Sequence, residues 1–406
     1  MVTDTIIKKG LPDETSVKAG YKQTELGVIP EDWDVKKLGN IAKITRGASP
    51  RPIDSSIWFD EKSEIGWVRI SDVTKSKKLL KYTTQKLSEL GIKHSRFVEK
   101  SNLIMSICAT VGRPILTDLD VCIHDGFVVF RDPKIEKEYL YYILSFIEGD
   151  WSKNGQTGSQ MNLNTGLINF TQIAFPKSKP EQTAIATVLS DTDALIECLE
   201  KLIAKKKTIK QGAMQKLLTG KKRLPGFSGE WEMKKLGEVC EIKKGQLITD
   251  NTRINGIIPV IAGGKTPAYY HNKANRYGKT ITISGSGASA GYVAFHTCSI
   301  FASDCSTIEE SRSYSIDFIY FFLQSHQEKI YKMQTGGAQP HIHPSDLSPI
   351  IISVPKPEEQ TAIAAVLSDM DAEIERLVQK RVKYTMIKQG MMQQLLTGRI
   401  RIYANN

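Results

Sequence analysis

Eight short polar segments, four in each half of the chain, carry the side chains best suited to bind nucleic acid. Arginine and lysine bind phosphates and guanine, asparagine and glutamine pair with adenine, and serine and threonine bind more permissively. Seven of the eight segments contain glycine, which lets backbone approach a ligand closely. The predicted contacts are Arg46, Ser49, Arg51, Arg69, Ser71, Lys75, Thr110, Arg113, Asn154, Gln156, Ser159 and Gln160 in the first half, and Lys243, Lys244, Gln246, Lys265, Thr266, Tyr269, Ser286, Ser289, Gln339 and His341 in the second.

Each of these residues could instead be an ordinary solvated loop group, and Arg46, Arg69 and Lys265 are the strongest candidates. The formal net charge of +11 and the pI near 9.1 favour an anionic partner. No apolar run approaches the roughly 18 residues that a membrane span needs, and residues 1–20 lack the apolar core of a signal peptide. We therefore expect a cytoplasmic protein with no membrane partner.

Sequence signatures of catalysis are weak. The glycine-rich segment 284–291 lacks the Lys-Ser/Thr ending of a phosphate-binding loop, and the six cysteines form no CxxC pair. His341 and His343 have no Cys or carboxylate cluster beside them, so no metal site is predicted. The chain also lacks the Asn/Asp-Pro-Pro-Tyr/Phe segment expected of an adenine methyltransferase, and no nuclease-like cluster of carboxylates and lysine is evident. We predict no catalytic residue.

The elements that must position these segments are repeated. A 44-residue stretch that begins at Glu181 returns at Glu359 with 27 identical positions. Both copies have an apolar seven-residue stripe, which predicts a helix of about 35–40 residues in a coiled coil. A proline precedes each copy, and Gly220 and Gly398 suit a left-handed C-cap. The natural partner of each helix is the other copy, in antiparallel pairing, through a seam of Ile185, Leu195, Leu199, Leu202, Ile209, Ile363, Met370, Leu377, Tyr384, Ile387 and Met391.

The regions between the helices are also duplicated, but more weakly. Residues 32–47 match 230–245, whereas Gly112, Asp125 and Gly158 pair with Gly291, Asp304 and Gly337 at a spacing of 179. The change of spacing places about 19 extra residues in the first region, near residues 53–73. The paired glycines suggest backbone requirements, and the paired aspartates suggest a shared turn.

Short β-branched and aromatic runs broken by turn residues predict mixed α/β (α+β) domains. The predicted architecture is a pseudo-twofold repeat of domain and helix. Its parts are a polar N-terminal segment (1–20), a first domain (21–178), a first helix (179–222), a second domain (223–355) and a second helix (356–401).

This arrangement resembles the specificity subunits of Type I restriction–modification enzymes from about Tyr21 onward. The resemblance rests on the phrase YKQTELGVIPEDWDVKKLGNI, the weaker phrase LPGFSGEWEMKKLGEV, both helix phrases from EQTAIA to LLTG, and the lead-ins FPKSKPEQ and VPKPEEQ. It implies two target-recognition domains that each read one half of a bipartite, asymmetric site in double-stranded DNA. It also implies an antiparallel coiled coil that spaces the domains and docks two modification (methyltransferase) subunits.

The same resemblance implies that the chain performs no chemistry and holds no cofactor. The partner subunits would use S-adenosylmethionine for adenine methylation, and ATP and magnesium once restriction motor-nuclease subunits join. Two alternatives remain open from the residues alone. The chain could be a single-chain DNA-modifying or DNA-cleaving enzyme, or a scaffold that binds only protein through its helices.

Overall fold

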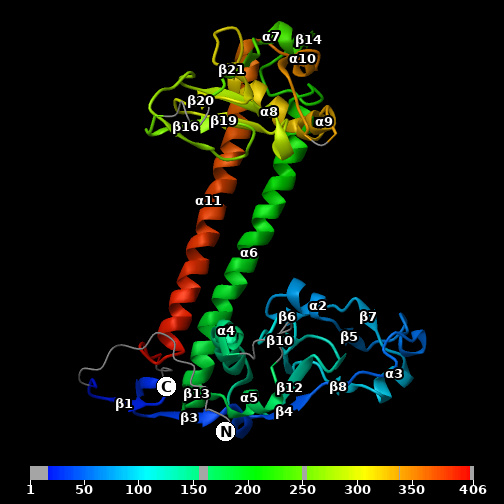
Figure 1. Ribbon diagram of the computed structural model, residues 1–406, viewed down its shortest axis with the longest axis vertical. Helices are drawn as coiled ribbons and strands as arrows, with labels where there is room; N and C mark the ends of the chain where they lie inside the picture. The colour runs from blue at the N-terminus through cyan, green and yellow to red at the C-terminus, as the bar shows by residue number, and fades with distance from the viewer. Residues whose placement is uncertain (1–16, 155–162, 249–253, 338, 403–406) are drawn as a thin grey trace. The chain divides into compact units, whose positions relative to one another are not determined.

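The computed structural model describes residues 17–154, 163–248, 254–337 and 339–402 (Figure 1). Gln156, Ser159, Gln160 and Gly158 lie outside the described residues, and of Asn154 only the helical backbone is described. The chain divides into two compact units: residues 1–197 with 382–406, and residues 198–381. Each unit contains one α/β domain and a part of both long helices. Among the helices in the described part of the chain, none combines the length and apolarity needed to span a bilayer.

In the first unit, two mixed sheets carry the domain. The five-stranded sheet has the order β4 (Lys43–Arg46), β12 (Phe127–Arg131), β9 (Leu103–Ser106), β10 (Pro114–Thr117) and β6 (Leu79–Leu80). The four-stranded sheet has the order β7 (Gln85–Lys86), β5 (Gly66–Val68), β11 (Val121–Ile123) and β8 (Arg96–Val98). Strands β9, β10, β11 and β5 are buried along their whole length, as their continuous apolar runs require.

The second unit repeats this plan with fewer strands. Its four-stranded sheet has the order β15 (Lys243–Lys244), β21 (Cys305–Glu309), β18 (Thr280–Ser284) and β19 (Val293–His296). Its three-stranded sheet has the order β17 (Tyr269–His271), β16 (Ile258–Ile261) and β20 (Phe301–Ala302). The parallel pairing of β20 with β16 matches that of β11 with β5. The two domains therefore share their central topology.

The extra chain of the first domain lies only partly within the range that the sequence predicted. Between β5 and β7, residues 69–84 form α2 (Ile70–Lys75) and β6, whereas residues 262–268 join β16 and β17 without a helix. The prediction of an insertion near residues 53–73 was therefore only partly right. Equivalent strand ends could not be aligned from the sequence because these short strands share few residue types.

Smaller elements accompany the sheets of each unit. In the first unit they are α1 (Leu38–Ile41), α3 (Glu89–Lys93), α4 (Lys137–Asn154), α5 (Thr165–Phe170) and the strand pair β3 (Trp33–Lys37) with β13 (Gln172–Pro176). In the second they are α7 (Leu236–Val239), α8 (Ile316–Ser325), α9 (Gln327–Lys332), α10 (Pro344–Leu347) and the pair β14 (Glu232–Lys235) with β22 (Ile351–Val354). The apolar core of each unit includes residues from both long helices.

The predicted long helices are confirmed: α6 (Lys179–Leu217) and α11 (Pro357–Leu395) have 39 residues each (Figure 1). Gly220 and Gly398 follow their ends with φ of +70°. In the first unit Lys388 binds Asp193 at 2.7 Å, and in the second Lys206 binds Glu373 and Lys210 binds Asp371, both at 2.7 Å. Within the second unit the partner number falls as the α6 number rises, so the helix segments run antiparallel.

The buried stripe of these helices differs from the predicted seam. Ile185, Leu199 and Ile363 are buried, and Leu195, Met370, Leu377, Tyr384 and Met391 are partly buried. Leu202, Ile209 and Ile387 are instead 36%, 46% and 39% exposed, which corrects their assignment. Ile203 and Lys210, one residue after Leu202 and Ile209, are buried in their place. Other buried positions outside the predicted seam are Leu189 and Leu217 in α6 and Leu367, Ile374 and Leu395 in α11. Positions i+3 and i+4 both lie near one helix face, and Lys210 contacts Gln324 and Phe321 of the domain helix α8.

The first turn of each long helix carries a buried carboxylate, which binds an arginine that follows the end of the other helix. Glu181, 4% exposed, binds Arg401 through two hydrogen bonds of 2.5 and 2.7 Å in the first unit. Glu359, 2% exposed, binds Arg223 through two of 2.5 and 2.6 Å in the second. The residues correspond between the repeats, since Arg223 and Arg401 each follow a Leu-Leu-Thr-Gly turn. The repeat therefore contacts itself reciprocally.

The glutamine that follows each buried glutamate attaches the helix to its domain. Gln182 accepts a hydrogen bond from the Glu136 backbone N–H at 2.7 Å and donates to the Pro176 carbonyl. Gln360 does the same with the Ser315 N–H, at 2.9 Å, and the Pro355 carbonyl. Both N–H groups stand at the start of a domain helix, where they lack intrahelical partners.

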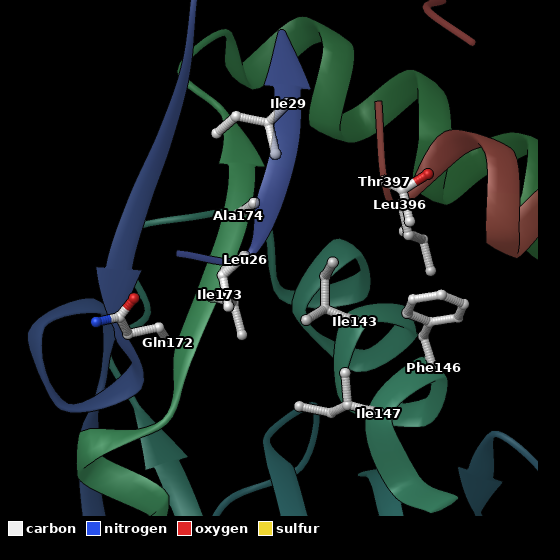
Figure 2. Close-up of a pocket in the computed structure, with 10 residues that line it drawn as sticks. All are labelled: Leu26, Ile29, Ile143, Phe146, Ile147, Gln172, Ile173, Ala174, Leu396 and Thr397. Carbon is white, nitrogen blue, oxygen red and sulfur yellow. The ribbon is translucent and has the colours of Figure 1, made fainter. Parts of the chain in front are cut away.

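The N-terminal hairpin, β1 (Tyr21–Thr24) with β2 (Gly27–Pro30), has no counterpart in the described residues of the second unit. The Tyr21 hydroxyl donates to the Gly398 carbonyl at 3.1 Å. An apolar cavity remains between the hairpin, α4, β13 and the end of α11, and Figure 2 shows its lining: Leu26, Ile29, Ile143, Phe146, Ile147, Gln172, Ile173, Ala174, Leu396 and Thr397. The hairpin thus contacts the residues that follow α11 within the same unit.

We predict that Glu181→Ala lowers the free energy of unfolding by about 3 kcal/mol, because Arg401 loses a buried partner. Asp32, which also binds Arg401 but is 62% exposed, should matter less, so Asp32→Ala should cost about 1 kcal/mol or less. Denaturation followed by tryptophan fluorescence measures both. Glu358→Ala, which removes an exposed carboxylate from the first turn of α11, is the control. Equal losses for all three variants would contradict this account.

Candidate nucleic-acid interface

In the first domain, predicted contact residues gather around Asp125, in the turn after β11. The loop that follows β4 lies here because the Ala48 N–H donates to the Ile123 carbonyl at 3.1 Å. The Ser49 hydroxyl and the Arg51 guanidinium then donate to the Asp125 carboxylate at 2.8 and 3.3 Å. Arg46 donates through Nε to the Asp125 carbonyl at 2.7 Å. Three of the predicted residues therefore share one partner.

The titration of this cluster follows from its contacts. Burial tends to raise the pKa of Asp125, but the hydrogen bond from Ser49 and the charges of His124 and Arg51 hold it below its usual range. Burial lowers the pKa of His124, which Asp125 opposes and the charge of Arg69 reinforces. At neutral pH the cluster therefore combines a carboxylate, a neutral imidazole and arginine cations.

Two further segments of the first domain meet each other. The Arg69 Nε donates to Gln85 Oε1 at 2.6 Å, and its guanidinium lies 5.9 Å from the Trp67 ring centre. At the end of α2, the Thr74 and Thr110 hydroxyls are 3.4 Å apart, and Arg113 donates to the Ser76 carbonyl at 3.2 Å. Ser71 and Lys75, also on α2, are exposed. The predicted segment around residue 110 is thus beside the predicted segment around residue 75.

The second domain gathers its loops around Asp304 in the same way. The Gln246 N–H donates to the Ala302 carbonyl at 2.9 Å, which is the counterpart of the Ala48 bond. The Ser286 hydroxyl donates to the Asp304 carboxylate, and Ser286 also forms a backbone bridge with His341. Ser284 donates to the Gly264 carbonyl at 3.4 Å, which brings the neighbouring Lys265 loop to this cluster.

The remaining predicted residues of the second domain differ in how firmly they are held. The Lys265 ammonium lies 5.4 Å from the Tyr292 ring centre, and the Tyr269 hydroxyl donates to the Ile248 carbonyl at 3.0 Å. Lys243 forms ion pairs with Glu241 and Glu309, so it is the weakest candidate for a phosphate contact. Lys244, Gln246, Thr266 and Gln339 are exposed, whereas Ser289 and His341 are partly buried.

Two arginines outside the predicted set support these loops. Arg96, which is exposed, donates from β8 to the Arg46 carbonyl at 3.2 Å. Arg276, only 8% exposed, donates to the carbonyls of Lys244 and Asn275 and to the Thr307 hydroxyl. Neither lies in a glycine-rich loop, so composition gave no local signal for them.

The paired aspartates and glycines have distinguishable roles. Asp125 lies in a turn, as expected, but its carboxylate also joins loops distant in sequence. Gly112 and Gly291 have φ of +81° and +82°, and an added Cβ would lie 2.2 Å from Trp151 and 2.8 Å from Ile342. Gly337 has open space around it, so no backbone requirement is visible at that position.

His341 and His343 stack with ring centres 6.2 Å apart. Within the described ranges, no three His, Cys, Asp or Glu side chains are grouped in a way that could hold a metal ion. All six cysteines are free thiols, of which Cys198 and Cys298 are exposed.

Comparison with known proteins identifies the chain's family. Residues 30–208 and 228–384 match the family model described as the Type I restriction modification DNA specificity domain. The chain belongs to this family. The MjaVIII specificity subunit of a type I restriction enzyme from Methanocaldococcus jannaschii is 25% identical, over 92% of this chain and 94% of that protein. The EcoprrI specificity subunit from Escherichia coli is 22% identical, over 86% of this chain and 90% of that protein.

The fold has a counterpart among solved structures. The S subunit of a type I restriction–modification system from M. genitalium superposes with a TM-score of 0.65 at 16% identity. The match covers 89% of this chain and 96% of that one. The tandem α/β domains and long helices are therefore the fold of this specificity-subunit family.

We predict that Gly112→Ala destabilises the first domain by about 2 kcal/mol or more, because alanine disfavours a positive φ and would contact Trp151. Thermal unfolding of the full chain measures this loss. Gly149→Ala, in α4 where an added Cβ meets no atom within 4 Å, should be neutral or stabilising. Wild-type stability of Gly112→Ala would refute the backbone role.

Proposed function

We propose that this chain is the DNA-recognition subunit of a type I restriction–modification complex, and that each domain contacts one half of a bipartite site in double-stranded DNA. The observation that carries the proposal is the pair of equivalent loop clusters. Both stand at corresponding strand ends of related domains, yet one presents Arg46, Ser49 and Arg51 and the other Gln246, Lys265 and Ser286. Unlike side chains on a shared plan favour two different half-sites.

The chemistry of the clusters suits duplex DNA. Exposed arginine and lysine supply phosphate contacts, and serine, glutamine and arginine can reach base edges. The net charge of +11 supports the electrostatic part of such binding. Because the domains differ, the proposed site is asymmetric.

We propose that partner subunits, and not this chain, carry out methylation and cleavage of DNA. The relatives are named as specificity subunits of restriction enzymes, which favours assembly with two modification (methyltransferase) subunits and with restriction subunits. We propose that those subunits, in the cytoplasm, use S-adenosylmethionine, ATP and magnesium. The chain itself would be non-catalytic and would hold no cofactor.

The purified chain, given S-adenosylmethionine, ATP and magnesium, should neither methylate nor cleave DNA. Adding its modification subunit should produce sequence-specific adenine methylation, which methylome sequencing detects. Turnover by the isolated chain would instead favour a single-chain enzyme. An absence of DNA binding in both the isolated chain and the complex would favour a scaffold that binds only protein.

Replacing residues 225–355 with the equivalent region of a relative should change one half of the methylated site and leave the other half intact. The reason is that this region contains the second loop cluster and none of the first. Methylome sequencing of cells expressing the hybrid with the modification subunit reads both halves at once. A change in both halves would contradict the assignment of one half-site to each domain.

A further inference from the structure

Asp125 occupies the groups that a DNA phosphate would need in the first loop cluster. The Ser49 hydroxyl donates to one carboxylate oxygen at 2.8 Å, and the Arg51 guanidinium donates to the other at 3.3 Å. A hydroxyl and a guanidinium around two anionic oxygens are also a common set of contacts to a phosphodiester. The carboxylate therefore stands where a phosphate could bind.

The contacts of Asp125 are weak enough to exchange. The Arg51 side chain is 70% exposed and that of Asp125 43% exposed. Ion pairs at such sites contribute about 0–1 kcal/mol, so an incoming phosphate can replace the carboxylate at small cost. Arg46 is held differently, through the Asp125 backbone carbonyl, and would keep its place after the exchange.

The second domain has a carboxylate at the corresponding position, but the hydroxyl that donates to it comes from a different loop. Asp304 corresponds to Asp125 and accepts from the Ser286 hydroxyl, which lies in the loop after β18. The position of Ser49 corresponds to Leu247 in the repeat, and equivalent backbone hydrogen bonds of Ile107 and Gly285 make Cys108 the counterpart of Ser286. Each domain therefore supplies a hydroxyl from a different loop to the same carboxylate position. A carboxylate that only closes its own turn would not need a hydroxyl donor from another loop in both domains. A carboxylate that occupies the donors of neighbouring loops would need one.

We propose that Asp125 is a specificity-determining residue, whose carboxylate occupies Ser49 and Arg51 in the free protein and thereby weakens binding to non-cognate DNA. Non-cognate binding depends almost entirely on phosphate contacts, so it bears the full cost of displacing the carboxylate. A cognate site offsets that cost through base contacts made by the surrounding loops. This inference rests on the proposed DNA-recognition function and adds a residue that reduces the affinity for non-cognate DNA.

The test compares Asp125→Asn with wild type as full chain in complex with the modification subunits. Fluorescence anisotropy would measure affinity for a duplex with the methylated site and for a scrambled duplex, between 50 and 200 mM salt. We expect the variant to bind the scrambled duplex about three- to tenfold more tightly, and the salt slope to steepen by about one because one more phosphate is contacted. The ratio of cognate to scrambled affinity should fall.

Asp118→Asn is the matched control. Asp118 lies before β11, at the opposite end of the strand from Asp125, and pairs with Lys100 at 2.9 Å with 37% of its side chain exposed. The Asp118→Asn substitution removes one negative charge from the same domain, as Asp125→Asn does, and should leave the salt slope unchanged. Arg51→Gln should abolish the gain in the Asp125→Asn background, because the guanidinium that Asp125 occupies is then absent, and a double-mutant cycle measures this coupling.

The outcomes separate two failures. If wild type prefers the cognate duplex but Asp125→Asn matches Asp118→Asn, or loses affinity for both duplexes equally, the role of Asp125 is refuted and the proposed function stands. If wild type shows no sequence preference at all, the proposed function fails and this inference fails with it. Thermal unfolding of each variant checks that a loss of binding is not a loss of folding.

Discussion

The structure depends on two carboxylates that cannot be buried alone. Glu181 and Glu359 lie at the starts of the long helices with almost no exposed surface, and an unpaired charge in such a place costs several kcal/mol. Each is bound by an arginine that follows the end of the other helix. The start of either helix is therefore stable only beside the end of its partner, which makes antiparallel pairing a chemical requirement within each unit.

A second pair of equivalent contacts, each between a lysine and an aspartate, links the long helices to each other and to the domain of the same unit. Lys388 binds Asp193 and lies over the Tyr142 ring, while the equivalent Lys210 binds Asp371 and lies over Phe321. Tyr142 and Phe321 belong to α4 and α8, the helices whose starts are bound by Gln182 and Gln360. Polar contacts thus attach both long helices to both domains in corresponding ways, although the loops beyond those domains share few side chains.

The loops can vary without disturbing this arrangement because one equivalent backbone bond fastens the first loop of each cluster. The Ala48 and Gln246 N–H groups bind equivalent carbonyls whatever their side chains. Their side chains are then free to differ, and only the carboxylate of Asp125 or Asp304 recurs among them. A family that reads many sequences on one fold would be expected to divide its contacts in this manner.

The sequence by itself determined the tandem repeat, the two long helices with their glycine caps, and the polar loops, since periodicity, capping and loop composition are local properties. Only the tertiary structure decided which helix face is inward, because Leu202 and Ile209 are apolar yet exposed, while Lys210 is charged yet buried against Asp371. It also placed α2 and β6 in a connection that is longer than its counterpart in the second domain, and it assigned Arg96 and Arg276 to the loop clusters. Those outcomes depend on partners distant in the chain, and an apolar pattern does not show by itself which of two neighbouring helix positions is buried.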